Sequence, residues 1–126
     1  MKITTVLIVE DVEKSLAFWV DRMGFLKVAE VPEGDRIGFA ILTSGEAELM
    51  LESMESVRKD LPALLPSGDS NAAMLFLEVD DFADTQKRLE GYPVLIPERV
   101  TFYGMREIGV REPGGHVVVF AVKETQ

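Results

Sequence analysis

An apolar segment, an acidic corner and an amphipathic helix open the chain in that order, and this order constrains the fold more than any other feature. Residues 3–9 are apolar enough for a buried strand, and Asp11 can cap a helix that Gly24 then ends. The apolar residues of the expected helix recur at helical spacing: Val12, Leu16, Trp19, Val20 and Met23. The pattern predicts a strand followed by a helix that packs on it by one face.

A weaker copy of this pattern returns about 70 positions later. Residues 72–79 are again apolar, Asp81 stands where Asp11 stands in the first copy, and Gly91 can end the second helix. Turn residues flank further segments with the character of strands. We expect these strands at 26–31, 36–43, 47–52, 93–96, 101–111 and 116–122. The sequence therefore predicts two β-α-β-β-β modules.

Proline, serine and glycine gather between the two copies. We expect one domain over residues 1–126, with a first module at 1–53, a linker at 54–70 that holds a short helical turn near 57–60, and a second module at 71–126. The predicted fold class is α+β. Each helix would cover one face of its own sheet, and the two sheets would pair into an open, curved mixed sheet with a concave cleft.

The composition narrows the classes of partner. The chain has 13 basic and 22 acidic residues and a formal charge of −9, which repels nucleic acid and anionic membranes and suits a neutral or cationic small molecule. An acidic surplus also simply keeps many proteins soluble. There is no cysteine, no long apolar run and no glycine-rich phosphate loop. We expect a cytoplasmic protein without disulfides or thiolate metal sites.

Two segments resemble the vicinal oxygen chelate superfamily. Residues 9–19, VEDVEKSLAFW, followed by Met23-Gly24-Phe25, are similar to its V-x-D-x-x-x-S-x-x-F-Y … L-G-F opening. Residues 103–116, YGMREIGVREPGGH, resemble its G-x-R-x-x-x-x-D-P-D-G-H ending. The superfamily contains glyoxalase, bleomycin-resistance proteins, fosfomycin-resistance proteins and extradiol dioxygenases. The resemblance covers the whole chain and implies the fold, but not one activity.

The resemblance also implies where a metal would bind. Family enzymes usually hold a divalent metal through four histidine, glutamate or glutamine side chains, and the matching positions here are Thr4, Met50, Met74 and Val119. None of these is a usual ligand, because a threonine hydroxyl binds weakly and a thioether prefers soft metals. The resemblance is therefore nearest to the metal-free, bleomycin-resistance-like members. We expect no cofactor, and these four residues favour a binding protein over an enzyme.

Alternation along the strands extends these four positions into a predicted ligand-binding cleft. Its members are Thr4, Glu48, Met50, Glu52, Met74, Phe76, Glu78, Tyr103, Met105, Glu107 and Val119. The methionines could instead fill a core, and the glutamates could sit at strand ends in water. The direction of Arg106 stays open, because Gly104 could form a bulge that turns it inward. For His116 and Trp19, packing is favoured over catalysis and ligand stacking.

Two functions follow. The first is a metal-free small-molecule binding protein that sequesters an antibiotic or a metabolite in the cleft. The alternative is a metal-dependent lyase, isomerase or dioxygenase with a non-standard carboxylate site built from Glu48, Glu52, Glu78 and Glu107. A purely structural or partner-binding role is a third possibility. The resemblance implies a homodimer, in which cleft walls come from both chains and the halves can be exchanged.

Overall fold

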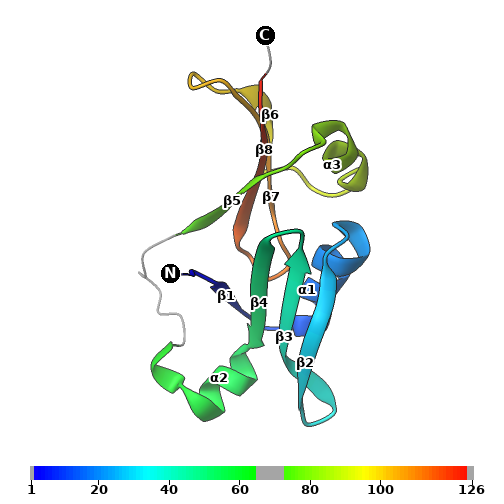
Figure 1. Ribbon diagram of the computed structural model, residues 1–126. Coiled ribbons are helices and arrows are strands. Elements are labelled where there is room, and N and C mark those ends of the chain that lie inside the picture. Colours follow the sequence, from blue (N-terminus) through cyan, green and yellow to red (C-terminus); the bar gives the residue numbers. More distant parts are fainter. Residues whose placement is uncertain (1, 65–72, 125–126) are drawn as a thin grey trace. The chain divides into compact units, whose positions relative to one another are not determined.

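A computed structural model describes residues 2–64 and 73–124 of the chain. The chain divides into two compact units, Met1–Asn71 and Ala72–Gln126 (Figure 1). Each unit carries one four-stranded mixed sheet that stays open rather than closing into a barrel. The α+β class expected from the sequence is confirmed, whereas the cleft shared by the modules stays a prediction.

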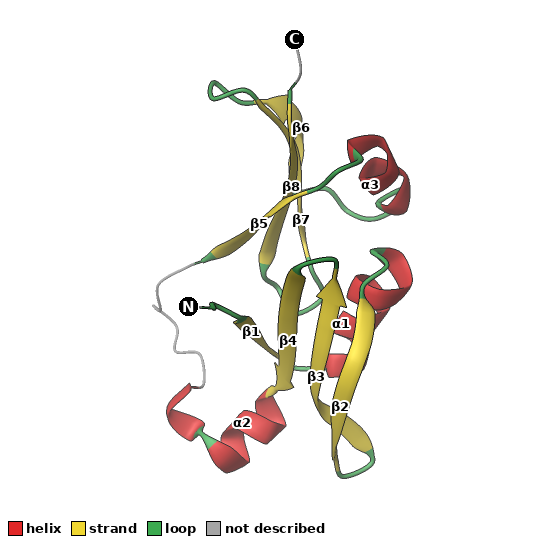
Figure 2. Ribbon diagram, viewed as in Figure 1, coloured by secondary structure: helices red, strands yellow, loops and turns green. Residues whose placement is uncertain are grey.

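The first unit is built on strands β1 (Thr5–Val9), β2 (Leu26–Glu33), β3 (Arg36–Ser44) and β4 (Ala47–Ser53), in the spatial order β1-β4-β3-β2 (Figure 2). Strand β1 runs parallel to β4, and the other neighbours are antiparallel. Leu49 and Leu51 are buried, while Met50 and Glu52, between and after them, are only half-buried. This alternation separates a helix-facing side of the sheet from an open side.

The first helix changes its winding part-way along. Asp11 caps α1 (Val12–Leu16) by accepting a hydrogen bond from the backbone N–H of Lys14 at 3.1 Å, as predicted, and α1 continues into a π-helical segment, η1 (Ala17–Arg22). A π turn holds one more residue than an α turn, so the side chains beyond it rotate about the axis. The predicted apolar face is therefore partly wrong: the buried residues are Val12, Ser15, Phe18 and Trp19, and Leu16, Val20 and Met23 are only half-buried.

Trp19 is a core residue. Its side chain is fully buried, and its ring meets those of Phe18 and Phe25 edge-on, with both centroid distances at 5.1 Å. Packing rather than ligand stacking is thus its role in this unit.

A helix follows β4 directly. Ser53 caps α2 (Met54–Asp60) by accepting from the N–H of Ser56 at 3.0 Å, and a short 3-10 helix, η2 (Pro62–Leu64), comes next. Helix α2 buries Val57, so it belongs to the core of the first unit and is longer than the turn expected near 57–60. The remainder of the expected linker, from residue 65 to 70, lies outside the described residues.

The second unit repeats the design. Strands β5 (Met74–Glu78), β6 (Ile96–Val100), β7 (Met105–Arg111) and β8 (Val117–Lys123) take the order β5-β8-β7-β6, with β5 parallel to β8. Asp81 caps α3 (Phe82–Arg88) through the N–H of Asp84 at 3.0 Å. The N-cap expected at Asp11 is therefore confirmed, and Asp81, at the matching position of the second copy, caps its helix in the same way.

The hairpin of β6 and β7 lies elsewhere than predicted. The expected strand at 93–96 is wrong, because β6 begins only at Ile96, and the strand expected from residue 101 begins at Met105. Residues 101–104 form the turn: Thr101 Oγ1 accepts from the N–H of Met105 at 3.1 Å, and Gly104 takes a positive φ of 81°. The sequence did not indicate this turn because it contains aromatic residues, whereas turns usually carry polar residues.

Across the described residues, none of the helices combines the length and the apolar character needed to cross a membrane.

Candidate functional site

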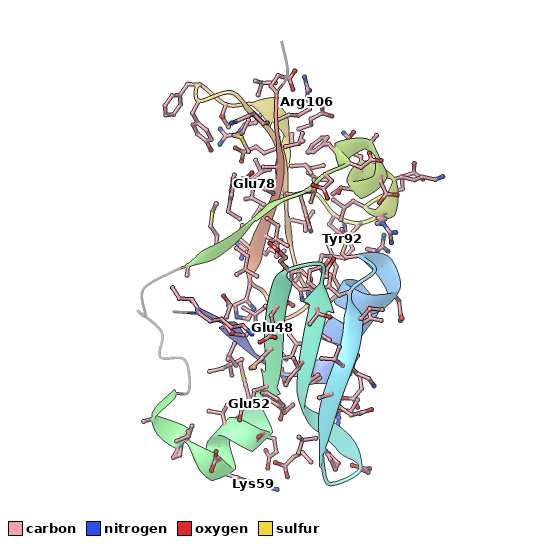
Figure 3. The ribbon with its side chains drawn as sticks, in the orientation of Figure 1. Glu48, Glu52, Lys59, Glu78, Tyr92 and Arg106 are labelled. Atoms are coloured by element: carbon pink, nitrogen blue, oxygen red, sulfur yellow. The ribbon has the colours of Figure 1, made fainter. Side chains whose placement is uncertain are left out.

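The predicted site residues of the first unit share the open side of its sheet. In register, Met50 lies between Val6 on β1 and Ile41 on β3. Thr4 donates a hydrogen bond from its hydroxyl to Glu48 Oε1 at 3.3 Å, which places both residues on this side. Figure 3 labels Glu48 and Glu52 along β4. The face is thus part apolar and part acidic.

Both glutamates of β4 already have partners. Lys2 Nζ lies 3.1 Å from Glu48 Oε2, and the Ser56 hydroxyl donates to Glu52 Oε2 at 3.1 Å. Four residues along a strand place their Cα atoms about 13 Å apart. These two carboxylates therefore act separately and not as a pair on one ion.

The predicted residues of the second unit also share one side of their sheet. Strand β5 contributes Met74, Phe76 and Glu78, which are in register with Val117, Val119 and Ala121 of β8. Met74 and Phe76 are 52% and 42% exposed, unusual values for large apolar side chains. Val119 is fully buried, so it forms part of the floor of this face rather than its surface.

Glu107 is the most unusual member of the set. It is only 2% exposed and is in register with Ala121. The Tyr103 hydroxyl donates to its Oε1 at 3.2 Å, and Arg99 Nη2 lies 3.7 Å from its Oε2. Burying a carboxylate costs free energy unless the carboxylate is paired, and the contacts with Tyr103 and Arg99 supply that pairing here.

Arg99 is a residue that sequence reasoning missed. It is in register with Glu107 in the β6–β7 hairpin. No local pattern marks it, because the strand expected at 93–96 would end three residues before it. Only the long-range pairing of β6 with β7 brings the two side chains together.

Arg106, whose direction the sequence left open, lies on the side of the sheet opposite to Glu107, because neighbouring residues on a strand alternate. Arg106, labelled in Figure 3, donates to both oxygens of Glu124, at 2.9 and 2.6 Å, and to Glu98 at 2.6 Å. The hydrogen bonds to Glu124 and Glu98 raise the pKa of Arg106 above its usual value. Two carboxylates thus occupy this guanidinium and leave it little capacity for an anionic ligand.

His116 belongs to the turn between β7 and β8. Its Nδ1 lies 2.5 Å from Oε1 of the buried Glu112, and its backbone N–H donates to the same oxygen at 3.2 Å. Burial alone would raise the pKa of Glu112, but hydrogen bonds from the His116 ring and from the backbone of Gly114 and His116 outweigh it and lower this pKa. The predicted packing role over the turn accounts for these contacts.

The residues at the four family metal positions do not fit a metal. The Thr4 hydroxyl is engaged with Glu48, Met50 and Met74 offer only thioethers, and the buried Val119 has no donor atom. Within residues 2–64 and 73–124, no three histidine, cysteine, aspartate or glutamate side chains gather closely enough to hold an ion. Of the carboxylates proposed as a displaced site, Glu48 and Glu52 lie four residues apart on β4, and Glu78 and Glu107 lie on β5 and β7 with β8 between them.

A hollow at the end of the first sheet was not foreseen from the sequence. It measures about 250 Å³ and lies where β1 and β4 end, lined by Glu10, Val12, Glu33, Arg36, Ile37, Ser53 and Glu55. Arg36 pairs with Asp11 at 2.8 Å, and Lys59 pairs with Glu33 at 3.0 Å. These ion pairs satisfy much of the charge around the hollow, so it offers no obvious anchor for a ligand.

The comparison with protein families decides the classification. A model of the Glyoxalase/Bleomycin resistance protein/Dioxygenase superfamily matches residues 3–120. The chain belongs to this superfamily. Members of the superfamily are often dimeric and bind small molecules. A search of curated protein sequences finds no match.

Solved structures of the superfamily share the fold. TioX from Micromonospora sp. ML1 aligns with a TM-score of 0.78 at 19% identity, covering 98% of each chain. A glyoxalase/bleomycin resistance protein/dioxygenase from Nocardioides aligns with a TM-score of 0.74 at 20% identity, and the alignment covers 98% of this chain and 84% of that chain. A lactoylglutathione lyase from Agrobacterium tumefaciens aligns with a TM-score of 0.71 at 21% identity, and the alignment covers 97% of this chain and 92% of that chain. At these identities the likeness establishes the fold alone.

Proposed function

We propose that this superfamily member binds an organic small molecule without a metal and sequesters it, whether the ligand is an antibiotic or a metabolite. The observation that carries the proposal is the chemistry of the four metal positions, where the side chains of Thr4, Met50, Met74 and Val119 do not form a ligand set. Without a Lewis acid at that place, the usual way of activating a substrate in this fold is missing.

The open faces of the two sheets support a binding role. Met74, Phe76 and Val6 are each more than 40% exposed, and Met50 lies beside Val6 in register. Methionine side chains adapt to ligands of different shapes, and aromatic side chains offer flat apolar surface. Exposed apolar residues on an ordered sheet face are typical of a surface that contacts a ligand or a partner.

A metal assay separates this proposal from the alternative enzyme. We expect protein purified without chelators to contain well under one equivalent of any divalent metal, and EDTA to leave the melting temperature unchanged. Stoichiometric metal that is lost on changing Glu52→Gln would refute the proposal and favour a carboxylate-bound metal enzyme.

A ligand screen tests binding directly. A compound present at about 100 times its Kd should stabilise the folded state by about 2.7 kcal/mol, which thermal shift detects readily. Met50→Lys should abolish the shift of a compound bound on the first sheet, whereas Ser44→Lys, at the exposed last residue of β3, serves as the matched control. A screen of cationic, neutral and anionic compounds that never raises the melting temperature would count against the proposal.

We further propose that the protein forms a homodimer, in line with the superfamily's common habit. Exposed apolar side chains such as Ile3 and Leu26, 87% and 67% exposed, are consistent with surface that a second chain covers. Sedimentation equilibrium at micromolar concentration tests this, and a monomer there would refute it.

A further inference from the structure

Four residues form a row across the open side of the second sheet. Glu78 on β5 is in register with Ala121 on β8, Ala121 with Glu107 on β7, and Glu107 with Arg99 on β6. Neighbouring strands lie about 4.8 Å apart, so Glu78 and Glu107 flank the Ala121 methyl group with their Cα atoms about 10 Å from each other. We name Glu78, Ala121, Glu107 and Arg99 the carboxylate row.

We propose that the carboxylate row binds the positive group of an organic cation, an amine, amidine or guanidine, whose flat apolar body lies over Phe76. The inference deepens the proposed function and rests on it, because it assigns a ligand class to the same open face. It goes further in naming the anchoring carboxylates and a side chain of the protein that competes with the ligand.

Glu107 has unused capacity to accept hydrogen bonds. A carboxylate can accept about four hydrogen bonds, yet among the described residues Glu107 receives one, from Tyr103. Its Oε2 faces Arg99 Nη2 at 3.7 Å, beyond hydrogen-bond distance, although the Glu107 side chain is only 3% exposed. A cation that reached this oxygen would form a charge-assisted hydrogen bond where the folded chain supplies none.

The two polar groups that contact the Glu107 carboxylate belong to exposed side chains. Tyr103 is 54% exposed, and the Arg99 side chain is 60% exposed. Arg99 therefore can swing into solvent at little cost while a ligand cation takes its place, and the buried charge stays compensated. In this arrangement Arg99 acts as a built-in competitor that occupies the site weakly when no ligand is bound.

The apolar part of the ligand class follows from β5. Phe76 precedes Glu78 by two residues, so both side chains lie on the same side of the sheet about 7 Å apart along the strand. The carboxylate of the exposed Glu78 makes no hydrogen bond or ion pair with any other described residue. A flat cation could therefore place its charge beside Glu78 and Glu107 and its ring against Phe76.

An organic cation fits the row better than a metal ion does. The carboxylates stand on strands separated by β8, and the structure, over the residues it describes, gathers no third acidic or histidine ligand beside them. Hard divalent ions need several oxygen ligands at about 2.0–2.6 Å. An amidinium with its own spread of N–H donors can instead bridge two separated acceptors.

The test compares benzamidine with its neutral analogue benzamide, titrated into the full chain and followed by two-dimensional amide NMR and calorimetry. We expect saturable benzamidine binding with shifts of the Phe76, Glu107 and Ala121 amides, and binding of benzamide at least tenfold weaker. Glu107→Gln and Glu78→Gln should each weaken benzamidine at least fivefold. Arg99→Ala should tighten it several-fold, because it removes the competitor.

The control is Glu46→Gln, which removes the same charge from an exposed turn of the first unit and should leave benzamidine affinity unchanged. Melting curves check whether the Glu107→Gln variant folds. If that variant does not fold, Glu78→Gln, a change at an exposed position, still tests the proposal. The inference is overturned if benzamidine does not saturate, or if it binds both carboxylate variants and wild type equally. Neutral compounds that stabilise the protein while benzamidine does not would overturn the inference alone, and a screen without any binder would overturn the proposed function as well.

Discussion

Glu112 should be the acidic residue whose loss costs the second unit most. It is 1% exposed, and its carboxylate accepts hydrogen bonds from the backbone N–H groups of Gly114 and His116 and from the His116 ring. Glu112→Ala leaves two backbone donors without their acceptor, each worth about 1–3 kcal/mol, so we expect a loss of about 2–6 kcal/mol in the free energy of unfolding. Glu112→Gln keeps one acceptor oxygen and should cost about 1–2 kcal/mol.

The direction of the pKa shift of Glu112 determines how its contribution to stability changes with pH. The pKa of Glu112 is lowered from the 4.5 of the unfolded reference, because the His116 and Gly114 hydrogen bonds outweigh desolvation. Its stabilising contribution is therefore fully present above pH 4.5 and is lost as pH falls through the folded-state pKa. The gap between wild type and Glu112→Gln should be widest near neutral pH and should narrow below pH 4.5.

Urea unfolding followed by far-UV circular dichroism, at a series of pH values, measures both effects. Asp80→Asn, at an exposed position of the same unit, should stay within about 0.5 kcal/mol of wild type. His116→Ala, which keeps the backbone donor, should cost less than Glu112→Ala. The reasoning is refuted if Glu112→Ala matches wild type at pH 7, or if the gap between Glu112→Gln and wild type widens as the pH falls.

Three further substitutions test the packing, a cap and a surface network. Gly109→Ala would place its Cβ 2.7 Å from Ile96 Cδ1, so it should cost about 1–3 kcal/mol in urea unfolding, and shortening Ile96→Val in the same chain should recover part of that loss. Asp81→Ala removes the acceptor for the Asp84 N–H and should cost about 1 kcal/mol, with Asp81→Asn much milder; equal effects would contradict a capping role. Arg106→Ala breaks the bonds to Glu98 and Glu124, and the resulting small drop in melting temperature should shrink in 1 M NaCl, whereas a salt-independent drop would point to packing instead.

The internal repeat and the N-cap at Asp11 were readable from the sequence because they are local. A cap needs only an acidic side chain and an N–H three residues later, and both Asp11 and Asp81 act in this way. The alternation along β4 is local as well: Leu49 and Leu51 are buried while Glu48, Met50 and Glu52 are half-buried, since side chains on a strand alternate whatever lies beyond it. The resemblance to the superfamily rested on these same corners and is confirmed by the family match.

Features that depend on distant partners could not be read in this way. The π turn at Ala17–Arg22 changes which residues the first helix buries, and nothing in a helical spacing pattern announces it. The β6–β7 hairpin lies a few residues from its expected place because the Phe102-Tyr103 turn looks like part of a strand. That shift is what pairs Arg99 with Glu107.

The sequence by itself thus determined the strand-helix corners and the two-module order, because both follow from residue type and short-range spacing. The resemblance to the superfamily added the expectation that Thr4, Met50, Met74 and Val119 stand where its metal ligands would be. Only the tertiary structure decided that Arg106 turns to Glu98 and Glu124, and that Glu107 is buried between Tyr103 and Arg99. The physical reason is that register between strands sets which side chains meet, and register is fixed by pairing across the sheet rather than by neighbours along the chain.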